Sequence, residues 1–451
     1  MLGVRMTLAR NILTTLTARI FVLGLSLVSS MVLARALGPE GRGLFALVLL
    51  LPELARTFGL LGFEQANAVY AGLEPGGRRA LAGQSLMVAS VAGGLTALAG
   101  ISYIALGAPG LGSTLHGPIW LYVLALLMVP GRLLIDFWLA VLRGMNRITA
   151  LNLVEVGTKV ASLLLVLVWV VGIGTGVQGA VWADSAMVAA TVLILGVLLA
   201  RSGALGRPWF DRCLWGRTTR FALPAYGSGI MTYLNYRVDQ LVIAVMLPPE
   251  ELAFYVIAVD IAERLWIIPG AVSTALLPHL TNSKKRDPAL VAAVARHATI
   301  WMGLGCLLVW AVAGVAVELI YSSAYGPTVA PLRWLLPGIF ALTIGKVLVA
   351  ELLAREKIRF AVWLSLGGAS VNAVANYWLI PRMGLSGASL ASSLSYTIVS
   401  LGLICFYVRE TGVSWGALLP RRDDLLVYIR LCRPRERGVL AQVPMEEVAC
   451  P

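Results

Sequence analysis

The chain has 451 residues, of which 59% are hydrophobic and only 13% are charged, and its mean hydropathy is +0.83. These values lie outside the range of water-soluble domains, so they exclude a soluble enzyme and a soluble binding module. The net charge of +13 resembles that of nucleic-acid-binding proteins, and its position along the chain therefore has to be examined before its size is interpreted.

Apolar stretches of about twenty residues follow one another from residue 11 to residue 408. A helix of about twenty residues crosses the roughly 30 Å hydrocarbon core of a bilayer. We therefore expect an all-α, polytopic membrane protein with about twelve transmembrane helices. The first stretch has no small-residue cleavage site, which predicts a retained helix rather than a signal peptide. The expected spans are 11–33, 43–62, 80–105, 118–142, 148–173, 177–200, 218–246, 252–278, 290–317, 331–354, 359–380 and 384–408.

Basic residues are distributed unevenly between the two sets of loops that these spans define. If the N-terminus is cytoplasmic, the loops and tails on that side carry 24 arginines and lysines, whereas the opposite side carries 4. The positive-inside rule then predicts that both termini of this multi-pass protein are cytoplasmic. The surplus charge reports topology, so we expect no nucleic-acid partner.

Three short matches relate the two halves of the chain and indicate a duplication. At offsets of 208 to 212 residues, 176–180 matches 384–388, 39–40 matches 249–250, and 143–147 matches 355–359. Because each repeat holds six helices, the halves should form two parallel six-helix lobes around a central cavity. We expect an N-terminal lobe at 1–212, a C-terminal lobe at 213–408 and a basic cytoplasmic tail at 409–451. In the tail, 421–433 is either a surface helix on anionic lipid or a solvated segment.

Sixteen charged residues fall inside the expected spans, more than two residues from either end. Each costs roughly 2.5–3.5 kcal/mol at the bilayer centre, so each needs a partner, a wet cavity or a function. They are Arg19, Arg56, Arg132, Lys159, Arg237, Arg264, Arg296, Lys346, Glu53, Asp136, Glu155, Asp184, Asp239, Asp260, Glu263 and Glu351.

Several of these charges have an opposite charge one helical turn away, which predicts local neutralisation. Arg296 is expected to snorkel to the cytoplasmic surface instead. The pairs are Glu53/Arg56, Arg132/Asp136, Glu155/Lys159 and Asp260/Arg264.

Arg19, Arg237 and Lys346 have no acidic residue on the same face of their helix, so they either line a phosphate-binding cavity or form salt bridges with other helices. Arg56 and Arg264 are further candidates for the cavity, although each has a carboxylate within one turn. Substrate-binding cations are thus expected at these five positions.

Asp184 and Asp239 are the candidates for coupling a proton or cation to transport, and a bond to a neighbouring helix is the alternative for each. The sequence contains no P-loop, no Gly-x-Ser-x-Gly and no aspartate-rich loop, so we expect no catalysis. Its five cysteines show no CxxC spacing. We therefore expect no disulfides, no metal site and no cofactor.

The segment 31–46, MVLARALGPEGRGLFA, resembles the first loop of the polysaccharide transporter, or oligosaccharide flippase, branch of the multidrug, oligosaccharidyl-lipid and polysaccharide exporter superfamily. Residues 234–240, LNYRVDQ, and 380–388, IPRMGLSGA, support the resemblance, which covers the chain to about residue 408. The resemblance implies that the first segment is a structural Gly/Pro turn. In the lipid II flippases of this superfamily, arginines on helices one, two and eight line the cavity, which points by position to Arg19, Arg56 and Arg264.

The resemblance implies a flippase in the bacterial inner membrane. It would move an undecaprenyl-pyrophosphate-linked oligosaccharide from the cytoplasmic to the outer leaflet by alternating access, for polysaccharide biosynthesis. Its partners would be this glycan lipid, membrane lipids and possible glycan polymerase or ligase proteins. Two alternatives are open: a drug or small-molecule exporter of the same superfamily, and a non-transporting membrane scaffold for glycan-assembly enzymes.

Overall fold

A computed structural model of the chain describes residues 2–107, 116–207, 211–282, 288–354, 358–421 and 424. Nearly all of these residues are helical, and none of them lies in a β-strand. The all-α fold expected from the sequence is therefore confirmed.

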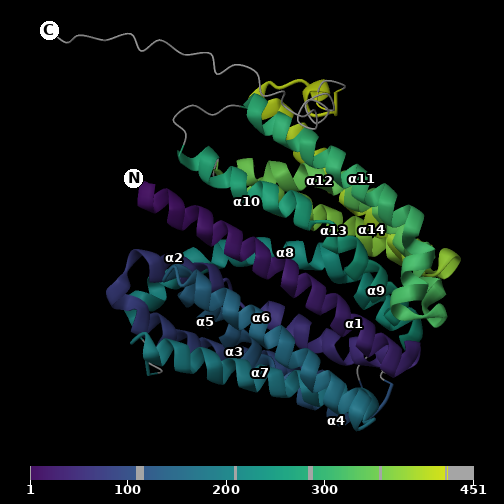
Figure 1. Cartoon of the computed structure of the whole chain (residues 1–451), viewed down its shortest axis with the longest axis horizontal. Coiled ribbons are helices and arrows are strands. Elements are labelled where there is room, and N and C mark those ends of the chain that lie inside the picture. Colours follow the sequence, from purple (N-terminus) through teal and green to yellow (C-terminus); the bar gives the residue numbers. More distant parts are fainter. Residues whose placement is uncertain are drawn as a thin grey trace, which may run out of the picture.

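The helices form two lobes: α2 to α7 lie in the lower part of Figure 1, α10 to α14 lie in the upper part, and α1 and α8 run between them. The first half contains α1 (Leu2–Gly59), α2 (Phe63–Leu73), η1 (Pro75–Gly77), α3 (Arg78–Ala105), α4 (Ile119–Leu127), α5 (Val129–Gly144), α6 (Ile148–Val166), η2 (Leu167–Gly172) and α7 (Gly176–Arg201). The second half contains α8 (Arg212–Met246), α9 (Pro249–Arg264), α10 (Ile267–Asn282), α11 (Pro288–Tyr321), η3 (Ser323–Thr328), α12 (Val329–Ala354), α13 (Ile358–Met383), α14 (Leu385–Thr411) and η4 (Trp415–Ala417).

Helix α1 contains both of the first two expected spans, joined at a kink rather than by a loop. Gly38 at the kink has φ 67° and ψ 177°, a left-handed φ that glycine adopts at little cost. Pro39 follows and disfavours a helical conformation at the residue before it. The Gly-Pro pair therefore ends one span and starts the next without any intervening coil.

All twelve expected spans are helical, but two of them are broken. The fourth consists of α4 and α5, which meet at Met128, and the eighth consists of α9 and α10, which meet at Leu265 and Trp266. Eight helical stretches of the described residues are long and apolar enough to cross a membrane, and one of them, 17–59, holds two expected spans. The protein is therefore a multi-pass membrane protein.

Corresponding positions in the two halves adopt corresponding structures. Gly176 begins α7 and Gly384 precedes α14, with φ angles of 60° and 57°. Ile148 and Ile358 each begin the helix that follows a basic loop. The duplication indicated by the sequence is thus visible in the helix boundaries.

At the end of the bundle that holds Gly38 and η3, here called the outer end, the two lobes are in close contact. A Cβ atom on Gly43 would lie 1.8 Å from the carbonyl oxygen of Pro249, so α1 and α9 touch through their backbones. The Tyr325 hydroxyl donates to the Ala34 carbonyl oxygen at 2.8 Å, and Arg35 donates to the Ile320 carbonyl oxygen at 2.9 Å. These contacts seal the outer end.

Helix α8 joins the lobes at the opposite end, here called the inner end. It packs on α2 near its start and on α13 and α14 farther along. Arg217 forms an ion pair with Glu74, and Gln84 donates to the Thr218 hydroxyl at 2.8 Å. The boundary expected at residue 212 coincides with the start of this helix, which contacts both lobes.

The chain after α14 folds back onto the inner end of the C-terminal lobe. Leu418 is buried against α11 and α14, and Arg296 binds both carboxylate oxygens of Asp424, at 2.7 and 3.1 Å. This carboxylate and the Ala417 carbonyl oxygen hold the Arg296 guanidinium at the inner end, and its position relative to the membrane surface stays a prediction. Of the segment 421–433, only 421 and 424 lie within the described residues.

Candidate functional site: charged cavities between and within the lobes

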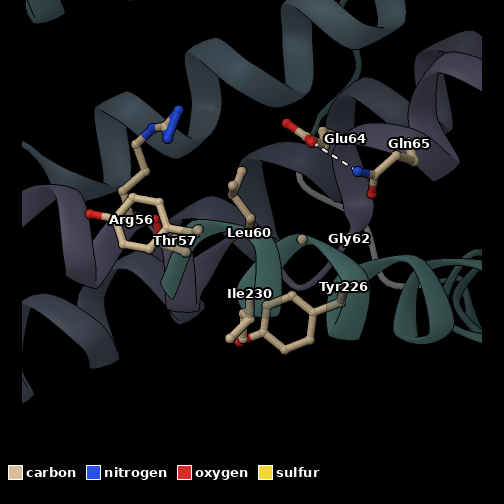
Figure 2. A pocket seen from close by; sticks show the side chains of 10 residues that line it. Arg56, Thr57, Leu60, Gly62, Glu64, Gln65, Tyr226 and Ile230 are labelled. Atoms are coloured by element: carbon tan, nitrogen blue, oxygen red, sulfur yellow. Dashed lines mark hydrogen bonds between the residues drawn. The ribbon is translucent and has the colours of Figure 1, made fainter. Parts of the chain in front are cut away.

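A cavity of about 180 Å³ lies between the lobes, where the end of α1 and the start of α2 face α8 (Figure 2). Its wall combines apolar, aromatic and charged side chains from both lobes. The lining residues are Arg56, Thr57, Leu60, Gly62, Glu64, Gln65, Tyr226, Gly229, Ile230 and Tyr233.

Arg56 is the cation of this cavity, and two carboxylates fix its position. Its Nη1 lies 3.1 Å from Glu53 Oε1, and its Nε lies 3.0 Å from Asp136 Oδ2. The side chain is 25% exposed, so it reaches the cavity while it is held from behind. Glu64 adds a third carboxylate at the wall. A substrate phosphate would therefore have to compete with carboxylates for this guanidinium.

Arg237 forms a salt bridge between helices. Its two Nη atoms each lie 2.9 Å from a carboxylate oxygen of Glu263, so α8 and α9 are joined by a bidentate pair. Such paired geometry satisfies both groups and leaves little of the guanidinium fork for a phosphate. Of the two alternatives that the sequence left open, the structure has the salt bridge.

Lys346 lies in a second cavity of about 340 Å³, inside the C-terminal lobe, with α8, α10, α12, α13 and α14 around it. Its Nζ lies 3.9 Å from the centroid of the Trp266 ring and 5.0 Å from that of Tyr236. It also donates to the Tyr236 hydroxyl at 3.1 Å. No carboxylate within the described residues pairs with this ammonium, so two aromatic rings stabilise its charge.

Arg264 and Arg19 belong to α9 and α1, two helices that pack against each other between the lobes. Arg264, on α9, donates to the Leu23 carbonyl oxygen of α1 at 3.2 Å, and its buried Nε has no hydrogen-bond acceptor among the described residues. Leu23 is one helical turn from Arg19, which is exposed and has no ion pair within the described part of the chain. These two guanidinium groups have the most free donor capacity among the predicted cavity cations.

Asp184 bonds to a neighbouring helix, which is the alternative that the sequence favoured. It forms an ion pair with Arg132, so α5 and α7 are joined. The local pair expected between Arg132 and Asp136 is replaced, because Asp136 instead binds Arg56 of α1. Two bridges between helices take the place of one bridge within a helix.

Asp239 forms no ion pair with a described basic residue and is only 1% exposed. Its Oδ2 accepts hydrogen bonds from Tyr255 at 2.5 Å and from Ser392 at 2.8 Å, and its Oδ1 accepts from the Gln240 amide at 2.7 Å. A buried carboxylate without a paired countercharge is costly, which makes it an acceptor for a proton or a small cation.

Buried amide and hydroxyl groups extend this cluster through the C-terminal lobe. The oxygens of Asn372 and Ser392 are 3.5 Å apart, and the Oδ1 of Asn376 is buried without a donor among the described residues. Oxygen atoms of this kind suit a hard monovalent or divalent cation. The described residues hold no group of three or more His, Cys, Asp and Glu that would bind a metal.

The sequence reasoning did not single out Tyr255, Asn372, Asn376 or Ser392, because it considered ionisable residues only. Asn372 and Asn376 are one turn apart inside an expected span, and such a spacing of polar amides was an available signal.

Of the remaining ion pairs that the sequence predicts within one helix, one forms and two do not. Glu53 and Arg56 pair locally as predicted. Glu155 and Lys159 are both exposed and lie beyond ion-pair distance of each other, and Arg264 bonds to a carbonyl oxygen of α1 rather than to Asp260.

Comparison with known proteins identifies the family. A family model described as "Polysaccharide biosynthesis protein" matches residues 8–284, more than half of the chain. The chain belongs to this family. The resemblance of its first loop and seventh span to the oligosaccharide flippases is thereby confirmed, while a search of curated proteins finds no match.

Solved structures with the same fold are membrane transporters. The lipid II flippase MurJ in an inward closed conformation is 14% identical with a TM-score of 0.73, and the match covers 93% of this chain and 90% of that one. An inward-facing multidrug resistance MATE transporter gives a TM-score of 0.69 at 14% identity, covering 87% and 96%. A Vibrio cholerae MATE transporter gives 0.60 at 14%, covering 91% and 97%. At these identities the likeness establishes the two-lobed fold of this superfamily.

Proposed function

We propose that this protein is a flippase that moves an undecaprenyl-pyrophosphate-linked oligosaccharide from the cytoplasmic to the outer leaflet of the bacterial inner membrane. The observation that carries the proposal is the interface between α1 and α9 of the two lobes, where neither Arg19 nor Arg264 has a carboxylate partner in the described residues. The family, which is one of polysaccharide biosynthesis proteins, makes a glycan lipid the expected cargo.

Phosphate recognition follows from the chemistry of these side chains. A pyrophosphate that leaves water needs fixed cations and donors to replace its hydration. A guanidinium stays charged in a low-dielectric site and offers a planar fork to two phosphate oxygens. Arg264 has a buried Nε without an acceptor in the described part of the chain, so part of its donor capacity is available to such a group.

Transport would proceed by alternating access of the two lobes. The sealed outer end corresponds to a state in which the head group would enter from the inner end. The inner contacts between α8 and the first lobe, which are closed in this structure, would open to admit the head group and then close again. The lobes would next rock, so that the contacts between α1 and α9 open. The lipid tail would stay in the bilayer throughout.

Ion coupling is assigned to Asp239. Its carboxylate is buried, has no ion pair with a described basic residue and is surrounded by hydroxyl and amide groups. Binding of a proton or a cation there would remove the cost of the buried charge and alter the packing of α8 on α14. Asp184 is the weaker candidate, because Arg132 already neutralises it.

The decisive experiment measures flipping with purified full-length protein in vesicles that contain a labelled undecaprenyl-pyrophosphate oligosaccharide. A glycosidase that cannot cross the membrane reports how much substrate reaches the opposite leaflet. Arg19→Ala and Arg264→Ala should each lower the rate about tenfold or more, and Arg19→Lys should lower it less. Arg382→Ala, at an exposed arginine stacked on Trp378, is the matched control and should leave the rate unchanged. Normal rates in both alanine variants at normal protein levels would exclude these residues from phosphate binding.

A drug exporter is the second candidate, because the Glu64 carboxylate lines the cavity of Figure 2, while Glu53 and Asp136 neutralise Arg56 from behind. Such a wall suits an organic cation better than a pyrophosphate. If the vesicles accumulate a cationic dye in place of the glycan lipid, and Glu64→Gln stops that accumulation, the exporter is the correct assignment. A scaffold without transport activity would give neither signal.

A further inference from the structure

The sealed outer end contains an arginine that the proposed mechanism has not used. Arg42 follows the Gly38 kink by four residues and is 8% exposed. Its guanidinium lies over the Phe45 ring, 5.6 Å from the centroid, and its Nε is buried without an acceptor among the described residues. No carboxylate in the described part of the chain pairs with it. A buried cation in this condition costs several kcal/mol of folding free energy.

Two hydroxyl groups accompany Arg42 in the same region. Tyr321 is fully buried, and Ser30 is 7% exposed. Both hydroxyls lack full hydrogen-bond geometry to any described group, and the side chain that lies beside Tyr321 is Ser30. Tyr321 also lies within electrostatic reach of the Asp260 carboxylate and of the guanidinium groups of Arg264 and Arg42. Ser30 and Arg42 belong to α1 and Tyr321 to α11, so the cluster spans the interface between the lobes.

Arg42, Tyr321 and Ser30 can each donate a hydrogen bond, and Asp260, the carboxylate near Tyr321, forms no ion pair with Arg42 among the described residues. A guanidinium and two hydroxyls together match the oxygens of a phosphate group, which accepts bonds and carries negative charge. The close backbone contact of Gly43 with Pro249 and the bond from Tyr325 to Ala34 currently cover the cluster. The cluster would be uncovered when the outer end opens.

We propose that Arg42, Tyr321 and Ser30 form a second anion site, which receives the phosphate group of the cargo at the outer end before release. The identity of the cargo rests on the proposed function, whereas the anion site itself does not. In the sealed state the unpaired cation disfavours closure, so arrival of an anion at this site would stabilise the opened state.

The test is calorimetric titration of the purified full-length protein in nanodiscs of neutral lipid, with pyrophosphate as the probe. Loss of a charge-assisted hydrogen bond costs about 1.5 kcal/mol at the low end of its range, or about tenfold in affinity. Arg42→Gln should therefore weaken pyrophosphate binding about tenfold, and Tyr321→Phe should weaken it a few-fold. Arg333→Gln is the matched control, because Arg333 is also an outer-end arginine on an aromatic ring, that of Trp310, and should bind as the wild type does.

Thermal unfolding of the same variants separates a ligand site from a structural contact. Since no described carboxylate would be stranded by the change, Arg42→Gln should leave the unfolding midpoint unchanged or raise it. If Arg42 formed a structural salt bridge, its loss in Arg42→Gln would lower the unfolding midpoint instead. Arg42→Lys keeps the charge but not the planar guanidinium, so it should bind pyrophosphate with intermediate affinity. A lowered midpoint, or wild-type affinity in Arg42→Gln, would overturn the proposal.

The source of the phosphate group is decided by competition. A short-chain prenyl pyrophosphate should displace pyrophosphate from the wild type, and phosphatidylglycerol should not. Displacement by phosphatidylglycerol alone would mean a headgroup site for ordinary lipid and would overturn the assignment to cargo. Absence of glycan flipping in vesicles would refute the proposed function and leave the binding result as it stands.

Discussion

The charged side chains inside the membrane divide into two groups by their partners. Arg56, Arg132 and Arg237 each bind a carboxylate of another helix or turn, whereas Arg19, Arg264 and Lys346 bind none in the described residues. The first group can be explained by the stability of the helix bundle, and the second group requires a cavity or a ligand. The distinction predicts opposite results when each group is mutated.

We expect Arg237→Met to impair folding rather than transport itself. Removal of one partner strands the Glu263 carboxylate, at a cost of roughly 3–5 kcal/mol, so the amount of protein in the membrane should fall. The double variant Arg237→Met with Glu263→Leu removes both charges and should restore the amount to near wild type. Quantitative blotting measures the amount, and flipping in vesicles measures activity. Full abundance with abolished flipping in the double variant would mean that Arg237 binds substrate after all.

How far the sequence could predict the site depends on the kind of partner. Arg56 and Glu53 pair within one turn, and their spacing alone predicts this. Arg132 and Asp136 have an equally good spacing, but they do not pair with each other. Arg132 binds Asp184 and Asp136 binds Arg56, because helix packing brings these partners closer. Spacing along one helix predicts pairs within that helix only. The relative rotation of neighbouring helices determines which oppositely charged side chain lies close enough to form the ion pair. The polar cluster around Asp239 depends on the same unknown.

At the scale of the helix, breaks were harder to predict than spans. Composition predicts the twelve apolar stretches well, since membrane thickness sets their length. The short α2 falls where the sequence predicts a loop, because eleven residues are too few to register as a span. The merging of two spans at Gly38 was also not predicted, since the Gly-Pro pair fits a loop and a kink equally well.

The contact between α1 and α9 depends on the missing side chain of Gly43. A Cβ atom at this position would overlap the carbonyl oxygen of Pro249, so Gly43→Ala should push the outer ends of the lobes apart. Spin labels at the exposed positions Ala36 and Glu250 would report the separation. We expect the distance distribution to shift to longer values in Gly43→Ala. Gly94→Ala, at a helical glycine with nothing within 4 Å, is the control, and the same shift there would contradict the argument.

The docked segment after α14 should release in acid. Hydrogen bonds from the Arg296 guanidinium hold the pKa of Asp424 below its ordinary value. A carboxyl whose pKa is lowered on folding contributes stability above its unfolded pKa of about 3.9, and this contribution is lost as pH falls through the lower folded value. Amide hydrogen exchange of Trp415–Ala417, corrected for the intrinsic rate, should therefore be slow at pH 7 and faster below about pH 3.5. Asp424→Asn should exchange quickly already at pH 7, and unchanged protection in that variant would disprove the role of the pair.

At the scale of the whole molecule, the two lobes contact each other at both ends, but through different chemistry. The outer end closes through backbone contact and tyrosine hydrogen bonds, whereas the inner end closes through an ion pair and the Gln84–Thr218 bond. Exposed ion pairs contribute little and are screened by salt, so the inner contacts are the easier ones to break. This asymmetry agrees with a resting state that is poised to open at the inner end.

The orientation of the whole bundle is a prediction that the distribution of charge makes by itself. With 24 basic residues on one side and 4 on the other, the inner end should face the cytoplasm. After the native cysteines are replaced, Thr175→Cys and Met383→Cys at the exposed outer end should react with an impermeant thiol reagent in intact cells. Gly76→Cys and Ser414→Cys, exposed at the inner end, should react only after the cells are opened. Each pair has one position in each half of the chain. A reversed labelling pattern in both halves would refute the predicted topology, whereas a reversed pattern in the second half alone would refute parallel repeats. The proposed direction of transport depends on this result, because the end that is sealed here must be the one that faces away from the site of substrate synthesis.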